Sequence, residues 1–597
     1  MNKLTFASVL LLSTAIFISC SPVINQHPSF NDDTKTLPTT TISPYGAYLA
    51  GRVAHIRKDF DNASTYYQIA YQNNQDNPEL INKLFLLLTS RGKVDEAVAY
   101  AEKNLKINTK NNFAHMVVAL SQLKNKQFDE SLKTLKNFNE PLYKTLIAPI
   151  LSAWNYAGLG NSKQAFSELE KIKNKEGLNS IYKTQQAFLF DYMGKNREAN
   201  QTYQEILADK NSEISVRLID IITNFYIRTN QIQNAETMLK STISHPALTI
   251  IITNLLQKLA TASSSETKPI LTTPAIGFAE ALLSIASSFH YDDIIDIAHM
   301  FTSLSLYLSP DYSTAKILMA DILESREMYQ DANQMYDSIP QNDVTYYPAQ
   351  LKKTRNYTKQ KDFASAEKLL KKLSKEYDDA QIYMDLGDIL RVNERYSEAV
   401  KYYDKAIAKT SDKNTLWVIH YAKGSALEQS GLWEEAEKSL MKAYEIKKHH
   451  LILNYLGYSW FKQNQNINKA FSMIVEAYNQ APFDPSINDS LGYALYKLGY
   501  YTMALPYLER AAEMYPSSAI ITSHLGDAYW FAHRKNEAVF QWKHALKLKD
   551  DSNELNPKII KQKIDEGILL EPNLSYDKQE IEETIKKIKK LKPFRSL

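Results

Sequence analysis

The sequence has few of the residues that sheets and disulfide frameworks need. Its 597 residues include 1 cysteine, 16 glycines and 20 prolines. One cysteine cannot form a disulfide within the chain, and so little glycine and proline leaves few turns to connect short β-strands. Because 44% of the residues are hydrophobic and 23% are charged, the composition predicts many packed helices, which is an all-α protein.

Excess charge of one sign is also nearly absent. The formal net charge is only +3, so the chain as a whole produces no strong field that would attract a polyanion. Nucleic-acid binding would need a local basic patch, and only the C-terminus has a dense run of lysines. We therefore expect no nucleic-acid partner.

Motifs for common enzyme chemistry are missing as well. Gly92-Lys93 and Gly194-Lys195 lack the upstream glycine of a phosphate-binding loop, and no GxGxxG, GxSxG or HExxH occurs. The 12 histidines are dispersed, and His449 and His450 are adjacent, so they cannot share one helix face as metal ligands. The sequence predicts a protein that is not an enzyme and has no cofactor, no metal site and no small-molecule substrate.

The N-terminus resembles a bacterial export signal. Lys3 precedes an apolar run over residues 4–18, which is the length of a signal-peptide core and shorter than a membrane span. The tetrapeptide ending at Cys20, Phe-Ile-Ser-Cys, resembles the lipobox, in which the cysteine becomes lipid-modified. We expect a signal peptide over residues 1–19 and lipidation at Cys20, with a structural thiol as the alternative. The residue after the cysteine is Ser21 rather than Asp, which resembles the sorting pattern of lipoproteins that are sent to the outer membrane. The resemblance therefore implies that the protein is anchored in the outer membrane of the cell envelope and faces the periplasm.

Residues 20–43 have the composition of a linker. Ser, Thr, Pro, Asn and Asp dominate this stretch, and no apolar periodicity is present. A disordered segment of this length has a root-mean-square reach of roughly 25–30 Å. We expect a lipid-attached flexible tether that holds the folded body near a membrane.

Regularly spaced small residues then predict a repeat. Ala63, Ala97, Ser131, Ala165 and Ala199 follow one another at intervals of 34 residues. Twelve residues before several of these positions stands another small residue, as in Gly51, Ala119, Ala153 and Ala187. The pattern resembles the tetratricopeptide repeat, a helical hairpin of 34 residues in which small residues let two helices approach closely.

The repeat spacing breaks once, which predicts two arrays. A first array is expected over residues 44–245, and a second over residues 276–551, with Gly457, Gly492 and Gly526 marking its most regular units. Residues 246–275 contain an apolar run and a Ser/Thr-rich stretch, and we interpret them as a joint, with a dedicated binding loop as the alternative. The resemblance implies a right-handed superhelical solenoid of about fourteen hairpins.

The stretches LNYLGYSWF, DSLGYALYKLG, HLGDAYW and QWKHALKLK, from residue 453 onwards, resemble a group of alphaproteobacterial cell-envelope tetratricopeptide-repeat proteins. This resemblance implies a bacterial envelope protein and supplies no catalytic residues. In the repeat family the first helix of each hairpin lines a concave groove that binds peptides or partner helices.

The groove positions of the family can be transferred to three hairpins of this sequence. The predicted partner-binding residues are Asn454, Tyr458, Phe461, Lys462, Asp489, Tyr493, Tyr496, Lys497, Ser523, Asp527, Trp530 and Phe531. Aromatic residues at helical spacing are also typical of a core, which is the alternative. In the first array the ninth positions are Leu86, Leu120, Trp154 and Phe188, and they could form an apolar groove, lie under a terminal helix, or indicate an error of phase.

The C-terminal residues 552–597 are expected to form capping helices and a basic tail. Ile581, Ile585, Ile588 and Leu591 recur at helical spacing, with acidic residues first and lysines last, an order that suits the helix dipole. A basic patch for anionic lipid or nucleic acid is the alternative.

These observations predict a lipid-anchored, non-enzymatic scaffold that binds other envelope proteins or peptides in the concave groove. The alternative is an envelope assembly factor or regulator that holds client outer-membrane proteins or modulates a cell-wall enzyme.

Overall fold

The computed structural model describes residues 42–57, 59–209, 214–242, 249–261, 264, 266–548, 555–568 and 574–590. The predicted signal peptide, Cys20 and nearly all of the predicted tether lie outside these ranges. Within them the chain forms α-helices and one short π-helix, with no strand. The predicted all-α helical-repeat fold is confirmed. Among the described helices, none has both the length and the apolar content that crossing a membrane requires.

The chain divides into two compact units at Lys361–Asp362. In the first unit the helices are α1 (Pro44–Ile56), α2 (Phe60–Gln72), α3 (Pro78–Ser90), α4 (Val94–Ile107), α5 (Asn112–Lys124), α6 (Phe128–Leu135), the π-helix η3 (Tyr143–Ile147), α7 (Ala148–Gly158), α8 (Ser162–Glu170), α9 (Asn179–Tyr192), α10 (Asn196–Ala208), α11 (Val216–Arg228), α12 (Ile232–Thr242), α13 (Thr249–Thr261), α14 (Pro274–Tyr291), α15 (Ile295–Leu308), α16 (Ser313–Ser325), α17 (Tyr329–Asp337) and α18 (Tyr346–Lys359).

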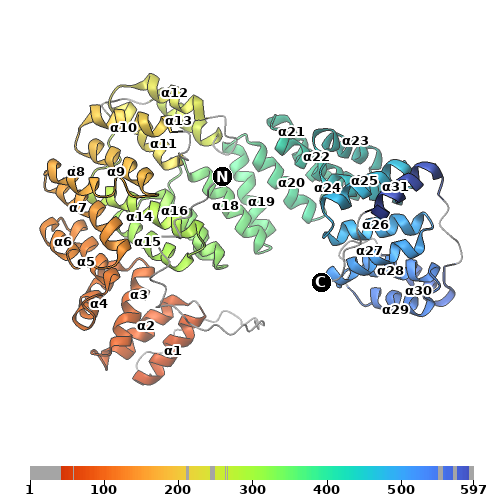
Figure 1. Cartoon of the computed structure of the whole chain (residues 1–597), viewed down its shortest axis with the longest axis horizontal. Coiled ribbons are helices and arrows are strands. Elements are labelled where there is room, and N and C mark those ends of the chain that lie inside the picture. The colour runs from red at the N-terminus through yellow and green to blue at the C-terminus, as the bar shows by residue number, and fades with distance from the viewer. Residues whose placement is uncertain are drawn as a thin grey trace. The chain divides into compact units, whose positions relative to one another are not determined.

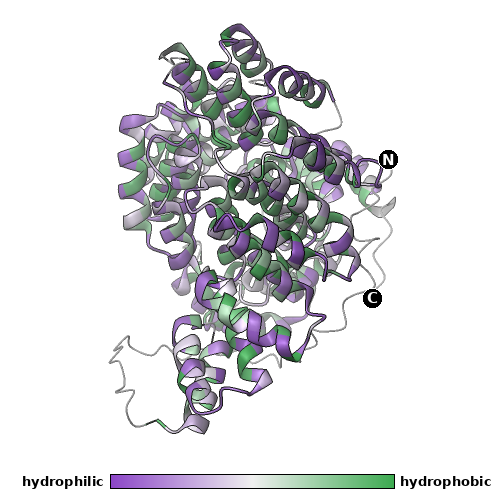
Figure 2. Ribbon diagram, turned by 90° about the vertical axis from the view of Figure 1, so that its left-hand side faces the viewer, coloured by the Kyte–Doolittle hydropathy of each residue, from purple (hydrophilic) through white to green (hydrophobic). Residues whose placement is uncertain are grey.

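The second unit continues the succession of helices (Figure 1). Its helices are α19 (Phe363–Glu376), α20 (Ala380–Val392), α21 (Tyr396–Lys409), α22 (Lys413–Gln429), α23 (Trp433–Ile446), α24 (His450–Lys462), α25 (Ile467–Gln480), α26 (Pro485–Lys497), α27 (Tyr501–Met514), α28 (Ala519–Phe531), α29 (Lys535–Ala545), α30 (Pro557–Glu566) and α31 (Lys578–Lys590). Along individual helices, hydrophobic and hydrophilic residues form separate stripes (Figure 2), as expected for helices that bury one face.

The small marker residues lie where the two helices of a hairpin meet. Ala63, Ala165 and Ala199 are fully buried. At Gly526 an added Cβ would lie 2.6 Å from the Trp542 ring and 3.2 Å from the carbonyl oxygen of Ala538. Any larger residue at these positions would force the paired helices apart, because packed interiors leave no free volume.

The helix pair α14–α15 does not continue the first array outwards. It packs against the first helices of earlier hairpins, since α14 contacts α5, α7 and α9 and α15 contacts α3 and α5. Figure 1 shows α14 and α15 beside these helices rather than beyond α13. The Ser303 hydroxyl donates to the Ser90 carbonyl at 2.8 Å, and the backbone of Gly277 lies so close to Trp154 that a Cβ there would be 2.1 Å from the indole.

This packing explains the apolar ninth positions of the first array. Leu120, Trp154 and Phe188 are buried, and Leu86 is half-buried. The helix pair α14–α15, from the middle of the chain, covers these positions. The expected alternative of a covering terminal helix is therefore wrong. Because α14–α15 lies against the first helices of these hairpins, the face that would otherwise line a groove is part of the hydrophobic core of the first unit.

The expected joint at residues 246–275 lies inside the first unit and not at its boundary. Its apolar run forms α13, which contacts α11 and α12 and buries Ile252 and Leu255. The chain then leads into α14. The boundary between the two compact units therefore falls about a hundred residues later in the sequence than the break in spacing, because helices after the break pack back onto the first array.

Candidate functional site

The predicted groove residues belong to α24, α26 and α28, the first helices of three successive hairpins in the second unit. Each of these helices packs against the helix that follows it, and α26 contacts both α24 and α28. Side-chain caps from His449, Asp484 and Ser518 fix where the three helices begin. The three helices therefore present their residues side by side.

The structure divides the predicted residues into three groups. Lys462 is exposed. Partial exposure is found for Asn454, Tyr458, Tyr493, Lys497, Trp530 and Phe531. Burial is found for Phe461, Asp489, Tyr496, Ser523 and Asp527.

Phe461 is a core residue, so its prediction as a groove residue is wrong. Its side chain is fully buried and meets Phe471 of α25 edge to face, with ring centroids 6.5 Å apart. Position 461 therefore faces the second helix of its own hairpin. Tyr496 is nearly as buried, at 6% exposure, with the rings of Phe531 and Tyr501 about 6 Å away.

Two of the partly exposed residues are tyrosines that lie close to each other. The ring centroids of Tyr458 and Tyr493 are 5.5 Å apart, and Tyr493 lies 4.5 Å from the ring of His524. We call Tyr458, Tyr493 and His524 the aromatic ladder. Sequence reasoning missed His524, whose only signal is a histidine in the middle of a predicted helix.

His524 is held by a buried carboxylate. Its Nδ1 lies 3.0 Å from both oxygens of Asp489, and both side chains are buried. Burial lowers the pKa of His524, but the charge of Asp489 and the hydrogen bond to Asp489 raise it by more. Asp527 raises this pKa further and Lys563 lowers it, and both of these effects are smaller. The net result is a pKa above the ordinary value of 6.5.

This pair predicts a stability that depends on pH. Because the folded-state pKa of His524 is raised, its stabilising contribution is complete below pH 6.5 and is lost as pH rises through the folded pKa. The urea midpoint of the second unit should therefore fall above pH 6.5, and Asp489→Asn should flatten this dependence. Tryptophan fluorescence is a suitable measurement, since every tryptophan except Trp154 lies in this unit. Equal pH slopes for both proteins would contradict the assignment.

The end of the predicted groove is occupied by the chain's own C-terminal segment. Lys563 of α30 places its Nζ 2.7 Å from both oxygens of Asp527, which also accepts from Trp542 Nε1 at 2.9 Å. Trp530 Nε1 donates to the Ile568 carbonyl at 3.2 Å. Asp527 and Trp530, predicted to bind partners, are thus engaged within the chain.

Helix α31 covers another part of the second unit. Ile581, Ile585 and Ile588 are buried, and α31 contacts α25. Ahead of this helix, Asn468 exchanges two hydrogen bonds with the backbone of Asp577, at 2.9 and 3.0 Å. Helix α31 therefore buries its apolar face against α25, whereas α29 at the end of the array is contacted by α30. The last lysines and Leu591 lie outside what can be described.

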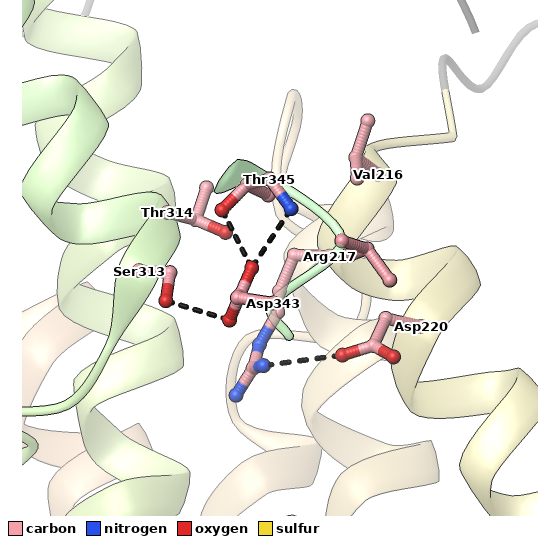
Figure 3. Close-up of a pocket in the computed structure, with 8 residues that line it drawn as sticks. Val216, Arg217, Asp220, Ser313, Thr314, Asp343 and Thr345 are labelled. Carbon is pink, nitrogen blue, oxygen red and sulfur yellow. Dashed lines mark hydrogen bonds and ion pairs between the residues drawn. The ribbon is translucent and has the colours of Figure 1, made fainter. Parts of the chain in front are cut away.

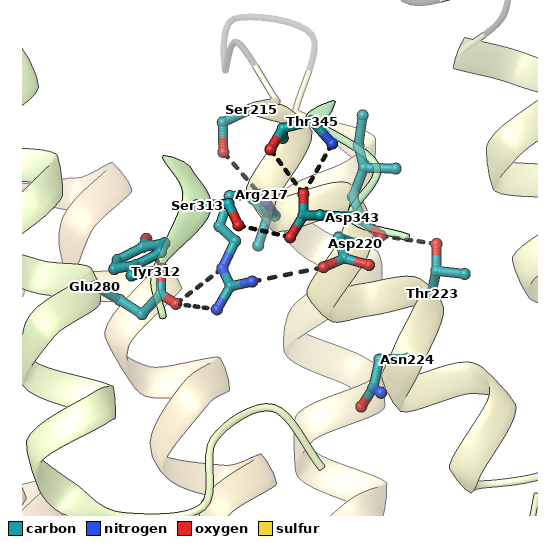
Figure 4. Close-up of polar contacts among 12 residues, drawn as sticks. Ser215, Arg217, Asp220, Thr223, Asn224, Glu280, Tyr312, Ser313, Asp343 and Thr345 are labelled. Carbon is teal, nitrogen blue, oxygen red and sulfur yellow. Dashed lines mark hydrogen bonds and ion pairs between the residues drawn. The ribbon is translucent and has the colours of Figure 1, made fainter. Parts of the chain in front are cut away.

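A second cluster of polar side chains lies in the first unit, where α11 approaches α14 and α16 (Figure 4). Arg217 donates from Nε and a terminal nitrogen to one oxygen of Glu280, at 3.0 and 2.8 Å. The Tyr312 hydroxyl donates to the other oxygen. Burial raises the pKa of the Glu280 carboxyl, and Arg217 and Tyr312 only partly oppose this effect.

The small cavity beside this cluster does not suit a substrate. It is lined by residues of α11 and of two segments further along the chain, among them Asp220, Ser313 and Asp343 (Figure 3). Its volume of about 10 Å³ is room for one water molecule. Asp343 is satisfied internally, by Ser313 and by the backbone and hydroxyl of Thr345, at 2.6–2.8 Å. We interpret the cluster as structural.

A metal centre is not indicated. Among the residues that the structure describes, no three histidine, cysteine, aspartate or glutamate side chains gather closely enough to hold a metal ion. The aromatic ladder and the polar residues beside it therefore remain the candidate functional site.

Comparison with solved structures gives several matches of low similarity. They include the APC/C hetero-tetramer Cut9-Hcn1, with 15% identity, a TM-score of 0.35 and coverage of 89% of this chain and 99% of that chain. Yeast Tom70 has 15% identity, a TM-score of 0.26 and coverage of 92% and 99%. YrrB, described as a TPR protein with an unusual peptide-binding site, has 20% identity, a TM-score of 0.25 and coverage of 31% and 94%.

Sequence comparisons identify the repeat. A TPR repeat-containing protein of Pseudomonas aeruginosa is 28% identical over 192 residues, which are 32% of this chain and 31% of that protein, so the match spans less than a third of the relative. Tetratricopeptide-repeat family models match residues 351–414 and 490–542, and residues 419–450. The chain therefore contains tetratricopeptide repeats at residues 351–414, 419–450 and 490–542.

Proposed function

We propose that this protein is a non-enzymatic scaffold of the bacterial cell envelope, anchored by lipid at Cys20, which binds partner polypeptides along the aromatic ladder of the second unit. The tetratricopeptide repeats support a scaffold that binds other proteins. The lipobox-like tetrapeptide before residue 21 supports the anchor.

The observation that carries the proposal is the composition of the partly exposed surface on α24 and α26. The rings of Tyr458 and Tyr493 lie 5.5 Å apart, and the exposed Lys462 follows Tyr458 by about one turn of α24. Tyrosine is enriched among the residues that contribute most to binding energy, because it combines a large apolar area with one polar group. A surface of this kind suits a polypeptide with both apolar and acidic side chains.

Asn454 lies one helical turn before Tyr458 on α24 and is partly exposed. Its side-chain oxygen is buried out of the reach of a partner, which leaves Tyr458 and Tyr493 as the proposed contact residues.

Replacing both Tyr458 and Tyr493 by alanine should weaken partner binding by about tenfold or more, since truncating one dominant interface residue costs about 2 kcal/mol. The measurement is photo-crosslinking in cells of the source bacterium, with a crosslinking amino acid at Lys462. A matched probe at Lys438, which is exposed on the second helix α23, reports the background.

The control variant carries Tyr291→Ala and Tyr515→Ala, because these tyrosines are exposed elsewhere, at 83% and 47%. It should keep the products seen at Lys462. Identical products at Lys462 and Lys438, or products that survive loss of Tyr458 and Tyr493, would contradict the proposed surface. Melting temperatures of all variants separate lost binding from lost folding.

Fractionation of the same cells tests the anchor. Cys20→Ser should move the protein out of the membrane fraction that resists a high-salt wash, because the lipid attachment point is lost and any remaining electrostatic attachment is weakened by salt. A protein that stays in the salt-resistant membrane fraction would count against lipidation while leaving the binding surface to be judged by the crosslinks.

A further inference from the structure

Helix α1 exposes an apolar stripe. Tyr45, Leu49, Val53 and Ile56 are spaced by four, four and three residues, so they lie along one face of the helix. Their exposed fractions are 86%, 59%, 49% and 73%. Large apolar side chains that line up and stay exposed in this way mark an interaction surface.

The opposite face of α1 holds the helix in place. Ala47, Gly51 and Ala54 are buried, and a Cβ at Gly51 would lie 2.8 Å from the ring of Tyr67 in α2. The helix is therefore docked through its small residues, and the apolar stripe points away from α2. The first repeat of a solenoid normally has a polar outer face, because no further repeat covers it.

The charges that α1 and its C-terminal cap carry have one sign. Arg52 and Arg57 are exposed, and α1 contains no aspartate or glutamate, although Glu79 of α3 accepts a hydrogen bond from Tyr48 of α1. A helix with an apolar stripe flanked by basic residues is suited to the boundary between headgroups and acyl chains of an anionic membrane. A second copy of the same helix fits less well, since pairing two such faces would bring like charges together.

The position of α1 in the chain agrees with this choice. Helix α1 begins only 24 residues after Cys20, and it is the described helix nearest to that residue in sequence. If Cys20 carries lipid, as proposed above, α1 is held within a tether's length of the membrane. The apolar stripe and the charges are observed independently of that proposal.

We propose that α1 docks on an anionic lipid surface, with Tyr45, Leu49, Val53 and Ile56 entering the headgroup boundary and Arg52 and Arg57 contacting lipid phosphates. Docking of α1 adds a second attachment to the lipid at Cys20. It would also fix which side of the first unit faces the membrane, which a flexible tether alone does not.

A single-label experiment tests this proposal on the full chain. Because Cys20 is the only cysteine, Cys20→Ser combined with Leu49→Cys places an environment-sensitive fluorophore at one site in α1. Adding phosphatidylglycerol vesicles should shift the emission to the blue. Phosphatidylcholine vesicles should give little shift, because this lipid has no net negative charge to attract the basic residues.

Neutralising the basic residues should weaken docking. With Arg52→Gln and Arg57→Gln added, half-saturation should need about 25-fold more anionic lipid, at roughly fivefold for each basic residue near the surface. The matched control carries the label at Thr237 of α12, an exposed position in the same unit, and its emission should not shift.

Each other outcome overturns the proposal. No shift at position 49, or an equal shift at position 237, would show that α1 has no specific contact with lipid. A shift that needs no vesicles and rises with protein concentration would identify a second copy as the occupant. Vesicle pelleting without a shift at position 49 would leave anchoring through the N-terminus intact while refuting the docking of α1.

Discussion

Replacing Glu280 by alanine is expected to lower the free energy of unfolding of the first unit by about 3–5 kcal/mol. The Glu280 side chain is 5% exposed and is the acceptor for two Arg217 nitrogens and for Tyr312. Without it, Arg217 remains a largely buried charge that keeps the ion pair with Asp220 at 3.5 Å, and Tyr312 loses its acceptor. Hydrogen exchange of α11, α14 and α16, together with the thermal midpoint, is the measurement.

A double substitution separates the lost pair from the lost volume. Arg217→Met with Glu280→Leu removes both charges while keeping apolar bulk, and replacing a buried ion pair in this way is often neutral or stabilising. This variant should recover most of the stability lost in Glu280→Ala. If the single and double variants were equally unstable, the ion pair would not be the cause.

Replacing Gly567 by alanine is expected to release the C-terminal segment from the end of the groove. Gly567 has φ 77° and ψ −171°, a region that is essentially restricted to glycine and costs other residues about 1–3 kcal/mol. A Cβ would also lie 2.0 Å from the Trp530 ring. Trypsin cleavage within α30 should become more than tenfold faster, since 1.4 kcal/mol of local opening is a factor of ten.

Gly431→Ala is the control for this experiment. Gly431 has the same φ of +77°, but nothing lies within 4 Å of the added Cβ, so the cost should stay near 1–2 kcal/mol and cleavage in α30 should not change. Unchanged cleavage in Gly567→Ala would mean that the contacts of Lys563 with Asp527 hold the segment by themselves. Under the proposed function, release should also expose Trp530 and extend the binding surface.

The repeats were predictable because their signal is local. Gly526 and Ala538 must be small wherever two helices cross closely, and the resulting periodicity can be read from the chain alone. The docking of α14–α15 was not predictable in this way. It depends on contacts such as Ser303 with Ser90, which are 213 residues apart and leave no periodic pattern.

The candidate site shows the same division. Helical spacing correctly grouped Tyr458 and Tyr493, whose rings lie 5.5 Å apart. It could not reveal that Phe461 faces the second helix of its own hairpin. An error of one residue in the assumed repeat positions turns a side chain by about 100° around the helix, which is enough to move it from the groove to the core. Nor could it reveal that Asp527 is neutralised by Lys563, since that partner comes from a separate helix 36 residues later.

The α14–α15 pair has a consequence for how this protein can change over evolutionary time. Solenoids readily gain or lose whole repeats, because each repeat contacts only its neighbours. Here α14 spans α5, α7 and α9 at once, and α15 spans α3 and α5. Deleting or duplicating the α5–α6 hairpin would change the spacing between Ser90 in α3 and Trp154 in α7, whose partners Ser303 and Gly277 lie in one helix pair. The number of repeats in this part of the chain is therefore fixed by a partner encoded more than a hundred residues downstream.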